Sequence, residues 1–231
     1  MSNTLPDTVL ENVSMICTPD DEDSGFVEDF IIPAPTIANT APATIYVSFS
    51  RSEETKFQTA NFTNVLKFTS KEVDPETGEP EDQGYDDEYE VDVLALGAGD
   101  YFLPTYIGNF QGVWDSLGPD NEVSDTLSLT SMKSIQGQPP AYVVKIWFVE
   151  ATAALIDSLS LQPLEGTDSV SSPSTHTIKL SGRTIEGGKV VALAKMAFSQ
   201  RSGVTLKLSA RSQDADGAAQ LVLDAVAWKE M

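Results

Sequence analysis

The first half of the chain alternates apolar and polar residues with a period of two. In the segment 43–52, Ile45, Val47 and Phe49 fall on one face of an extended chain. The same period, with some interruptions, recurs in four further segments: 9–18, 26–37, 64–73 and 88–97. Short alternating segments between turn residues, without a helical period, predict an antiparallel β-sandwich of the immunoglobulin-like kind. The Cys…Trp…Cys spacing of antibody domains is absent.

Segment 74–88, DPETGEPEDQGYDDE, separates the last two of these strands. Its proline, glycine and acidic residues bury too little apolar surface to order strongly, so we expect a mobile hairpin loop. A calcium-binding EF-hand loop that began at Asp74 would need glycine at its sixth position, where Glu79 stands, and Gly78 comes one residue early. We therefore interpret the segment as a solvated acidic loop.

The pattern changes near residue 108. Four apolar residues in 109–118 recur at the spacing of one helix face: Phe110, Val113, Trp114 and Leu117. Asn109 is a suitable N-cap, and Gly118-Pro119 is a strong stop signal. We therefore predict a two-turn helix here, and place the boundary between two domains near it, with one domain at 1–107 and the other at 108–231.

The rest of the second domain predicts an α+β arrangement, a small antiparallel sheet with one or two helices. Strand-like segments lie at 122–131, 176–185, 189–200 and 204–212. Segment 141–159 leaves strand and helix open, because its β-branched start suits a strand whereas its length and the entry at Pro139-Pro140 favour a helix. A last apolar segment at 220–228 has no assigned type.

The distribution of charge differs between the two halves. The net charge is −21; residues 1–107 hold 22 acidic and 4 basic residues, and residues 108–231 hold 13 and 10. Seven cations, from Lys179 to Arg211, lie in a stretch in which Glu186 is the only acid. The acidic half would repel nucleic acid and anionic membranes. The basic stretch suits an acidic peptide or protein surface, although scattered solvent-facing strand residues would give the same pattern.

The residues that catalysis or metal binding would need are scarce. His176 is the only histidine, so any hydrolase triad must use it, and with Cys17 as the only cysteine a zinc site lacks ligands. No nucleotide-binding or nucleophile-elbow motif occurs. We therefore expect no enzyme activity, no cofactor and no metal, and we expect His176 to be a surface or strand-end residue.

The location predicted from the sequence is cytosolic. A single cysteine excludes an internal disulfide, and the polar N-terminus does not resemble a signal peptide. No apolar run reaches the length that a membrane span requires.

Segment 66–91, LKFTSKEVDPETGEPEDQGYDDEYEV, resembles the appendage (ear) domain of the coatomer gamma subunit. It shares a KFT strand, a D-P-x-T-G-E turn, an acidic stretch and G-Y-x-D-E-Y. Further similar pieces lie in register along the chain, at 3–13, 109–118, 126–135, 175–182 and 204–212. The resemblance therefore covers nearly the whole chain.

This resemblance implies an immunoglobulin-like β-sandwich followed by a platform subdomain, as in the clathrin adaptor ears. It also implies a non-catalytic part of the COPI coat that serves Golgi-to-ER and intra-Golgi transport. The expected partners are an Arf GTPase-activating protein, other COPI accessory or coat proteins, and the rest of coatomer through a trunk that this chain does not include. We expect a cytoplasmic protein, peripheral on Golgi membranes and COPI-coated vesicles, without nucleic-acid binding or membrane insertion.

The resemblance also implies a binding site on the platform. The tryptophan of the family's site matches Trp114, one basic residue matches Arg211, and a second arginine falls near Ala194-Lys195. Lys195 supplies charge there without an arginine's bidentate fork. Periodicity alone favours a core position for Trp114, whereas the resemblance implies an exposed or groove-lining one. The alternative function is a structural module of a coat or scaffold that binds partners through the β-sandwich face.

Overall fold

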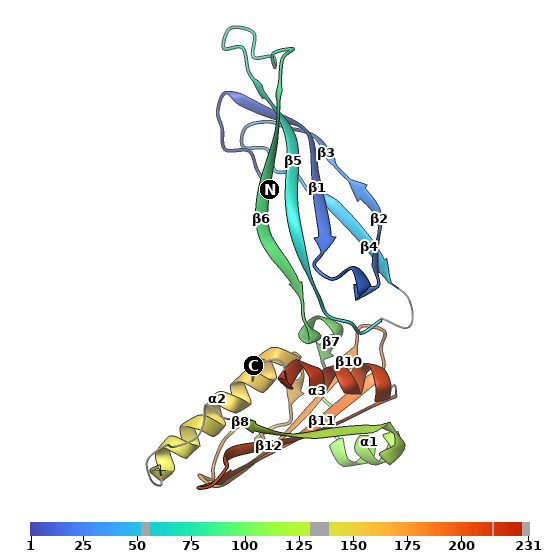
Figure 1. Cartoon of the computed structure of the whole chain (residues 1–231), viewed down its shortest axis with the longest axis vertical. Coiled ribbons are helices and arrows are strands. Elements are labelled where there is room, and N and C mark those ends of the chain that lie inside the picture. The colour runs from blue at the N-terminus through green and yellow to red at the C-terminus, as the bar shows by residue number, and fades with distance from the viewer. Residues whose placement is uncertain (52–55, 130–138, 214, 228–231) are drawn as a thin grey trace. The chain divides into compact units, whose positions relative to one another are not determined.

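The computed structural model describes residues 1–51, 56–129, 139–213 and 215–227. The chain divides into two compact units, Met1–Leu96 and Gly97–Met231 (Figure 1). The division falls at 96/97 rather than at the expected 107/108. Residues between these points join the second unit because β7 (Phe102–Pro104) pairs with β10 (Thr175–Thr184), far along the chain.

The first unit is an antiparallel sandwich of two unequal sheets. The wider sheet has the strand order β3 (Ala34–Ile37), β1 (Thr8–Pro19), β5 (Ala60–Glu72) and β6 (Tyr85–Leu96). The narrower sheet pairs β2 (Phe26–Ile32) with β4 (Tyr46–Arg51). The immunoglobulin-like sandwich expected from the alternating pattern is confirmed.

Apolar side chains from both sheets form the core of the first unit. The ring of Phe62 on β5 lies 5.4 Å from that of Phe26 and 5.0 Å from that of Phe49, both on the narrower sheet. A second cluster consists of Val13, Ala34, Ile37 and Leu66, with Ile45 packed against it. The face predicted for Ile45 and Phe49 is therefore the one that meets the core.

The acidic segment is shorter than the expected loop, because β6 already begins at Tyr85 and pairs with β5. The chain turns at Asp74, whose carboxylate accepts a hydrogen bond of 2.7 Å from the Glu76 amide. The amide of Gly78 donates to the Asp74 carbonyl at 2.8 Å. Pairing across the hairpin therefore extends well into the acidic stretch.

The second unit is a sheet with helices on both faces. Its strand order is β7, β10, β11 (Lys189–Ser199), β12 (Gly203–Ser212) and β8 (Glu122–Leu129), and β9 (Gln162–Pro163) pairs with β10. The helices are α1 (Phe110–Leu117), α2 (Ala141–Leu159) and α3 (Gln220–Ala227). The α+β platform is confirmed, and the open question at 141–159 is resolved as a helix.

The two faces of this sheet carry alternate residues of each strand. On β11, Val190, Ala192, Ala194 and Met196 are buried on one face, and Phe198 of the same face lies 6.1 Å from the ring of Trp147 on α2. On the other face, Val191 and Leu193 pack against α1. Figure 1 shows α2 and α3 on the first of these faces and α1 on the second. Among the described residues, no helix is long and apolar enough to cross a bilayer.

Candidate functional site

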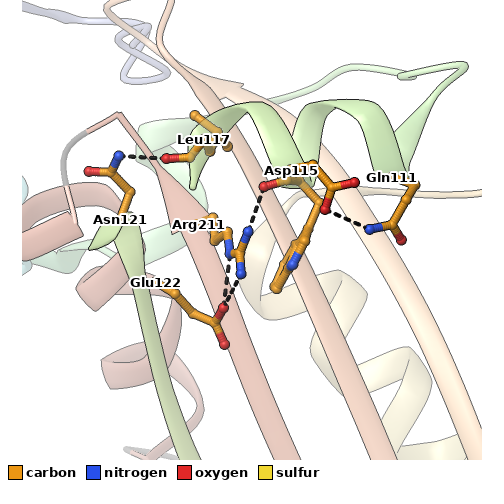
Figure 2. A network of polar contacts seen from close by, with 7 residues as sticks. Gln111, Asp115, Leu117, Asn121, Glu122 and Arg211 are labelled. Carbon is orange, nitrogen blue, oxygen red and sulfur yellow. Dashed lines mark hydrogen bonds and ion pairs between the residues drawn. The ribbon is translucent and has the colours of Figure 1, made fainter. Parts of the chain in front are cut away.

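Helix α1 is fixed at both ends by its local sequence. The Asn109 side chain caps the N-terminus by accepting a 2.9 Å hydrogen bond from the Gly112 amide. At the other end Gly118 adopts a φ of 77°, which favours glycine, and Pro119 follows. The Asn121 side chain then donates to the Leu117 carbonyl at 2.6 Å (Figure 2). The predicted helix, N-cap and stop signal are all present.

One face of α1 packs onto the sheet, and Trp114 lies at the margin of this face. Phe110 and Leu117 are buried with Val191, whereas Val113 and Trp114 are half-buried at the margin of this cluster. Trp114 is therefore neither a core residue nor a fully exposed one, since part of the indole contributes to packing and part reaches the surface.

The indole of Trp114 has a ring partner and a cationic partner. Its ring stacks on that of Phe110 with centroids 5.6 Å apart and an interplanar angle of 20°. The guanidinium carbon of Arg211 lies 4.4 Å from the indole centroid, within cation–π range. These contacts restrict the rotation of the indole.

Arg211 connects the helix to the sheet. Its Nη1 donates to the Trp114 carbonyl at 2.7 Å, and its Nε and Nη2 donate to Glu122 Oε2 at 2.9 and 2.6 Å (Figure 2). Glu122 lies directly opposite Arg211 in the pairing of β8 with β12. Because Arg211 is 9% exposed and its charge is paired, it positions Trp114 rather than presenting a free cation.

Lys195 lies on the same face of the sheet as α1, two residues beyond Leu193. Its backbone pairs with that of Lys207 on β12, and both side chains are exposed. Among the residues that the structure describes, no carboxylate forms an ion pair with either lysine. Like charges directly opposite each other on neighbouring strands repel, so an anion between them would relieve this repulsion.

Lys207 was not assigned to the site from the sequence, although it belongs to the basic stretch. Its place beside Lys195 follows from the register of β11 with β12, which the sequence pattern does not specify. Lys179 also lies near the site, with its Nζ 5.4 Å from the centroid of the Phe110 ring.

His176 differs from its expected environment. It is the second residue of β10, as expected for a strand end, but its side chain is buried and its Nε2 makes no hydrogen bond. Burial lowers the pKa of His176, and a hydrogen bond with the backbone of Thr167 and the charge of Asp168 oppose this effect. Of the two expected placements, the strand end is therefore the one found and the surface is not, since β10 turns this residue toward the face that α2 covers.

Comparison with known families decides the family of the chain. The family model described as "Coatomer gamma subunit appendage platform subdomain" matches residues 1–97, and the one described as "Coatomer subunit gamma-1 C-terminal appendage platform" matches residues 99–226. The chain belongs to the coatomer gamma appendage family. The boundary between the two matches, at residues 97–99, lies close to the division of the fold at 96/97.

Coatomer gamma subunits of distant organisms are similar to nearly the whole chain. The probable coatomer subunit gamma of Schizosaccharomyces pombe is 37% identical over 98% of this chain, and that of Drosophila melanogaster is 34% identical over 97%. The Saccharomyces cerevisiae subunit is 34% identical over 93%. The match spans 22% to 24% of the length of these relatives. This coatomer gamma appendage thus corresponds to about a quarter of each related subunit. Coatomer gamma is a subunit of the COPI coat.

Proposed function

We propose that this appendage is a non-catalytic docking module that recruits accessory proteins, such as an Arf GTPase-activating protein, to the COPI coat. Its proposed binding surface is centred on Trp114 and includes Lys195 and Lys207. The remaining coatomer subunits are proposed partners through parts outside this chain, and the proposed location is the cytoplasmic surface of Golgi membranes and COPI vesicles.

The half-buried, doubly stacked indole of Trp114 is the observation that carries this proposal. Tryptophan is enriched at binding hot spots because one side chain offers a large apolar area and an N–H donor. The contacts with Phe110 and Arg211 already hold this indole. A ligand therefore loses less free energy to ordering the site than it would on a mobile side chain.

The charges around the indole favour an acidic ligand. Lys195 and Lys207 are exposed neighbours on the face that carries α1. Arg211 is proposed to act indirectly, because Glu122 already neutralises its charge. The two lysines provide point charges rather than guanidinium forks, so they select for negative charge more than for one carboxylate geometry.

The proposed ligand is an aromatic or aliphatic anchor flanked by aspartate or glutamate. Burial of one such anchor contributes about 1.5–3 kcal/mol. We therefore expect single peptides to bind weakly, with dissociation constants on the order of micromolar, and coat assembly to gain strength through multivalency.

The decisive experiment compares wild type with Trp114→Ser in pull-downs from cytosol, read by mass spectrometry, followed by titration with a purified Arf GTPase-activating protein. Tyr142→Ser is a matched control, because Tyr142 is an exposed aromatic on α2 at the opposite face of the sheet. We expect Trp114→Ser to lose the partner and Tyr142→Ser to keep it. Thermal unfolding checks that both variants fold. Normal binding by a folded Trp114→Ser variant refutes the site.

A further inference from the structure

The two sheets of the first unit differ in width, and this leaves part of a core-facing surface uncovered. On β5, the side chains of Phe62, Asn64 and Leu66 are buried. Their partners across the strand on β6 are Leu94, Val91 and Tyr89. These partners share the inward face of the sheet, yet they are 59%, 38% and 66% exposed.

An open groove of about 730 Å³ lies beside these residues. Met15, Cys17 and Asn64 contribute to its floor from β1 and β5. It is also lined by Val47 of β4, by Ile45 just before that strand, and by the β6 segment 90–94. The groove is thus mainly apolar and lies between the two sheets, where a sandwich of equal sheets would hold a further strand.

Each of the two strands beside the groove is paired along one edge only. Among the described strands, β4 pairs with β2 alone and β6 with β5 alone. From the narrower sheet, the groove is lined by Val47 of β4 and by no residue of β2, so we take the free edge of β4 to border it. An extended segment that paired with this edge would widen the narrower sheet to three strands and cover the exposed inward face of β6.

The charge around the groove restricts what can occupy it. Glu90 and Asp92 line it, and none of its described lining residues is a lysine or arginine. Residues 1–96 hold 21 acidic and 4 basic residues. A second copy of the acidic β6, a nucleic acid and an anionic membrane would all be repelled.

We propose that the groove between β4 and β6 binds an extended, basic segment of a partner protein by strand addition to β4. Apolar side chains at alternate positions of that segment enter the groove, and its lysines or arginines face Glu90 and Asp92. This interface is independent of the surface around Trp114.

A thiol-protection assay tests this proposal. Cys17 is the only cysteine and contributes to the floor of the groove, so its alkylation reports occupancy. Burial and the charge of Glu28 raise the pKa of the Cys17 thiol, so alkylation is followed at mildly alkaline pH by intact mass. The probe is a short synthetic peptide in which valine and lysine alternate, and its control replaces valine with serine. We expect the first peptide to slow alkylation in a saturable manner and the second to have no effect.

Variants locate the binding and test its mode. Val91→Lys places a cation in the groove and should lower the affinity for the valine–lysine peptide by about tenfold or more. Val27→Lys, at an exposed valine of β2 outside the groove, is the matched control and should bind like wild type. Asp92→Lys provides a second groove variant if Val91→Lys fails to fold. A peptide methylated at alternate backbone nitrogens should lose binding, because it cannot pair with β4.

Three results would overturn the proposal. Equal protection by both peptides would mean that lysine alone, without apolar side chains, accounts for the effect. Unchanged affinity in folded Val91→Lys and Asp92→Lys variants would place the peptide elsewhere. Full binding of the methylated peptide would exclude strand addition.

Discussion

Replacement of Glu122 by glutamine tests whether the partly buried ion pair with Arg211 holds α1 to the sheet. Glu122→Gln keeps the shape and an acceptor oxygen, but it removes the negative charge that accepts the two hydrogen bonds of 2.9 and 2.6 Å from the Arg211 guanidinium. The guanidinium stays charged but loses its counter-charge, and its hydrogen bonds to an amide oxygen are weaker than those to a carboxylate, so the substitution should cost about 1–2 kcal/mol of unfolding free energy. For a unit of this size the unfolding midpoint should fall by roughly 3–8 °C.

The exposed pair of Lys67 with Glu88 provides a matched control. Its N–O distance of 2.7 Å is close to the 2.6 Å of Arg211 with Glu122, but its side chains are 41% and 64% exposed rather than 11% and 27%. Solvent screens such a pair, and Glu88→Gln should change stability by less than about 0.5 kcal/mol.

Urea and thermal unfolding, monitored by circular dichroism and by tryptophan fluorescence, measure both variants. The fluorescence of Glu122→Gln should also change before unfolding, because Arg211 stacks on the indole of Trp114. If Glu122→Gln and Glu88→Gln prove equally mild, burial does not strengthen the inner pair, and the positioning role assigned to Arg211 is refuted.

Two further predictions concern the exposed lysines and the histidine. Lys195→Glu and Lys207→Glu should each weaken binding of the Arf GTPase-activating protein several-fold and reduce the salt dependence of that binding, both measured by calorimetry. Lys145→Glu on α2 is the control and should change neither. An undiminished salt dependence in the first two variants would contradict the basic surface. His176 has a pKa below its ordinary value of 6.5 in the fold, so the unfolded chain binds the proton more tightly. Stability should therefore fall as pH drops below 6.5, and denaturant titrations of His176→Leu across this range should lose that slope; an equal slope in the variant would assign it to other groups.

Local patterns in the sequence were sufficient to predict most elements. The period-two segments became strands, and the spacing of Phe110 and Leu117 predicted α1, because both signals depend on neighbours within a few residues. The type of segment 141–159 stayed open, since its β-branched start and its length favour different structures. Packing of α2 against the sheet decides between them.

Long-range pairing accounts for what the sequence did not predict. The division at 96/97 depends on the pairing of β7 with β10. The paired state of Arg211 depends on Glu122, which lies 89 positions earlier. Trp114 and Arg211 could be named through resemblance, but Lys207 and the groove between β4 and β6 required the register of strands and the number of strands in each sheet.

The alternation along β12 makes the site more sensitive to a change in length than to many substitutions. Arg211, Ser209 and Lys207 share one face, while Leu208 and Ala210 are buried on the other. Loss or gain of a single codon between Lys207 and Arg211 would exchange these faces, and one of the two cations would then point toward the core. We therefore expect natural variation in this strand to preserve the spacing of its residues even where their identities drift, and insertions to accumulate in the loops.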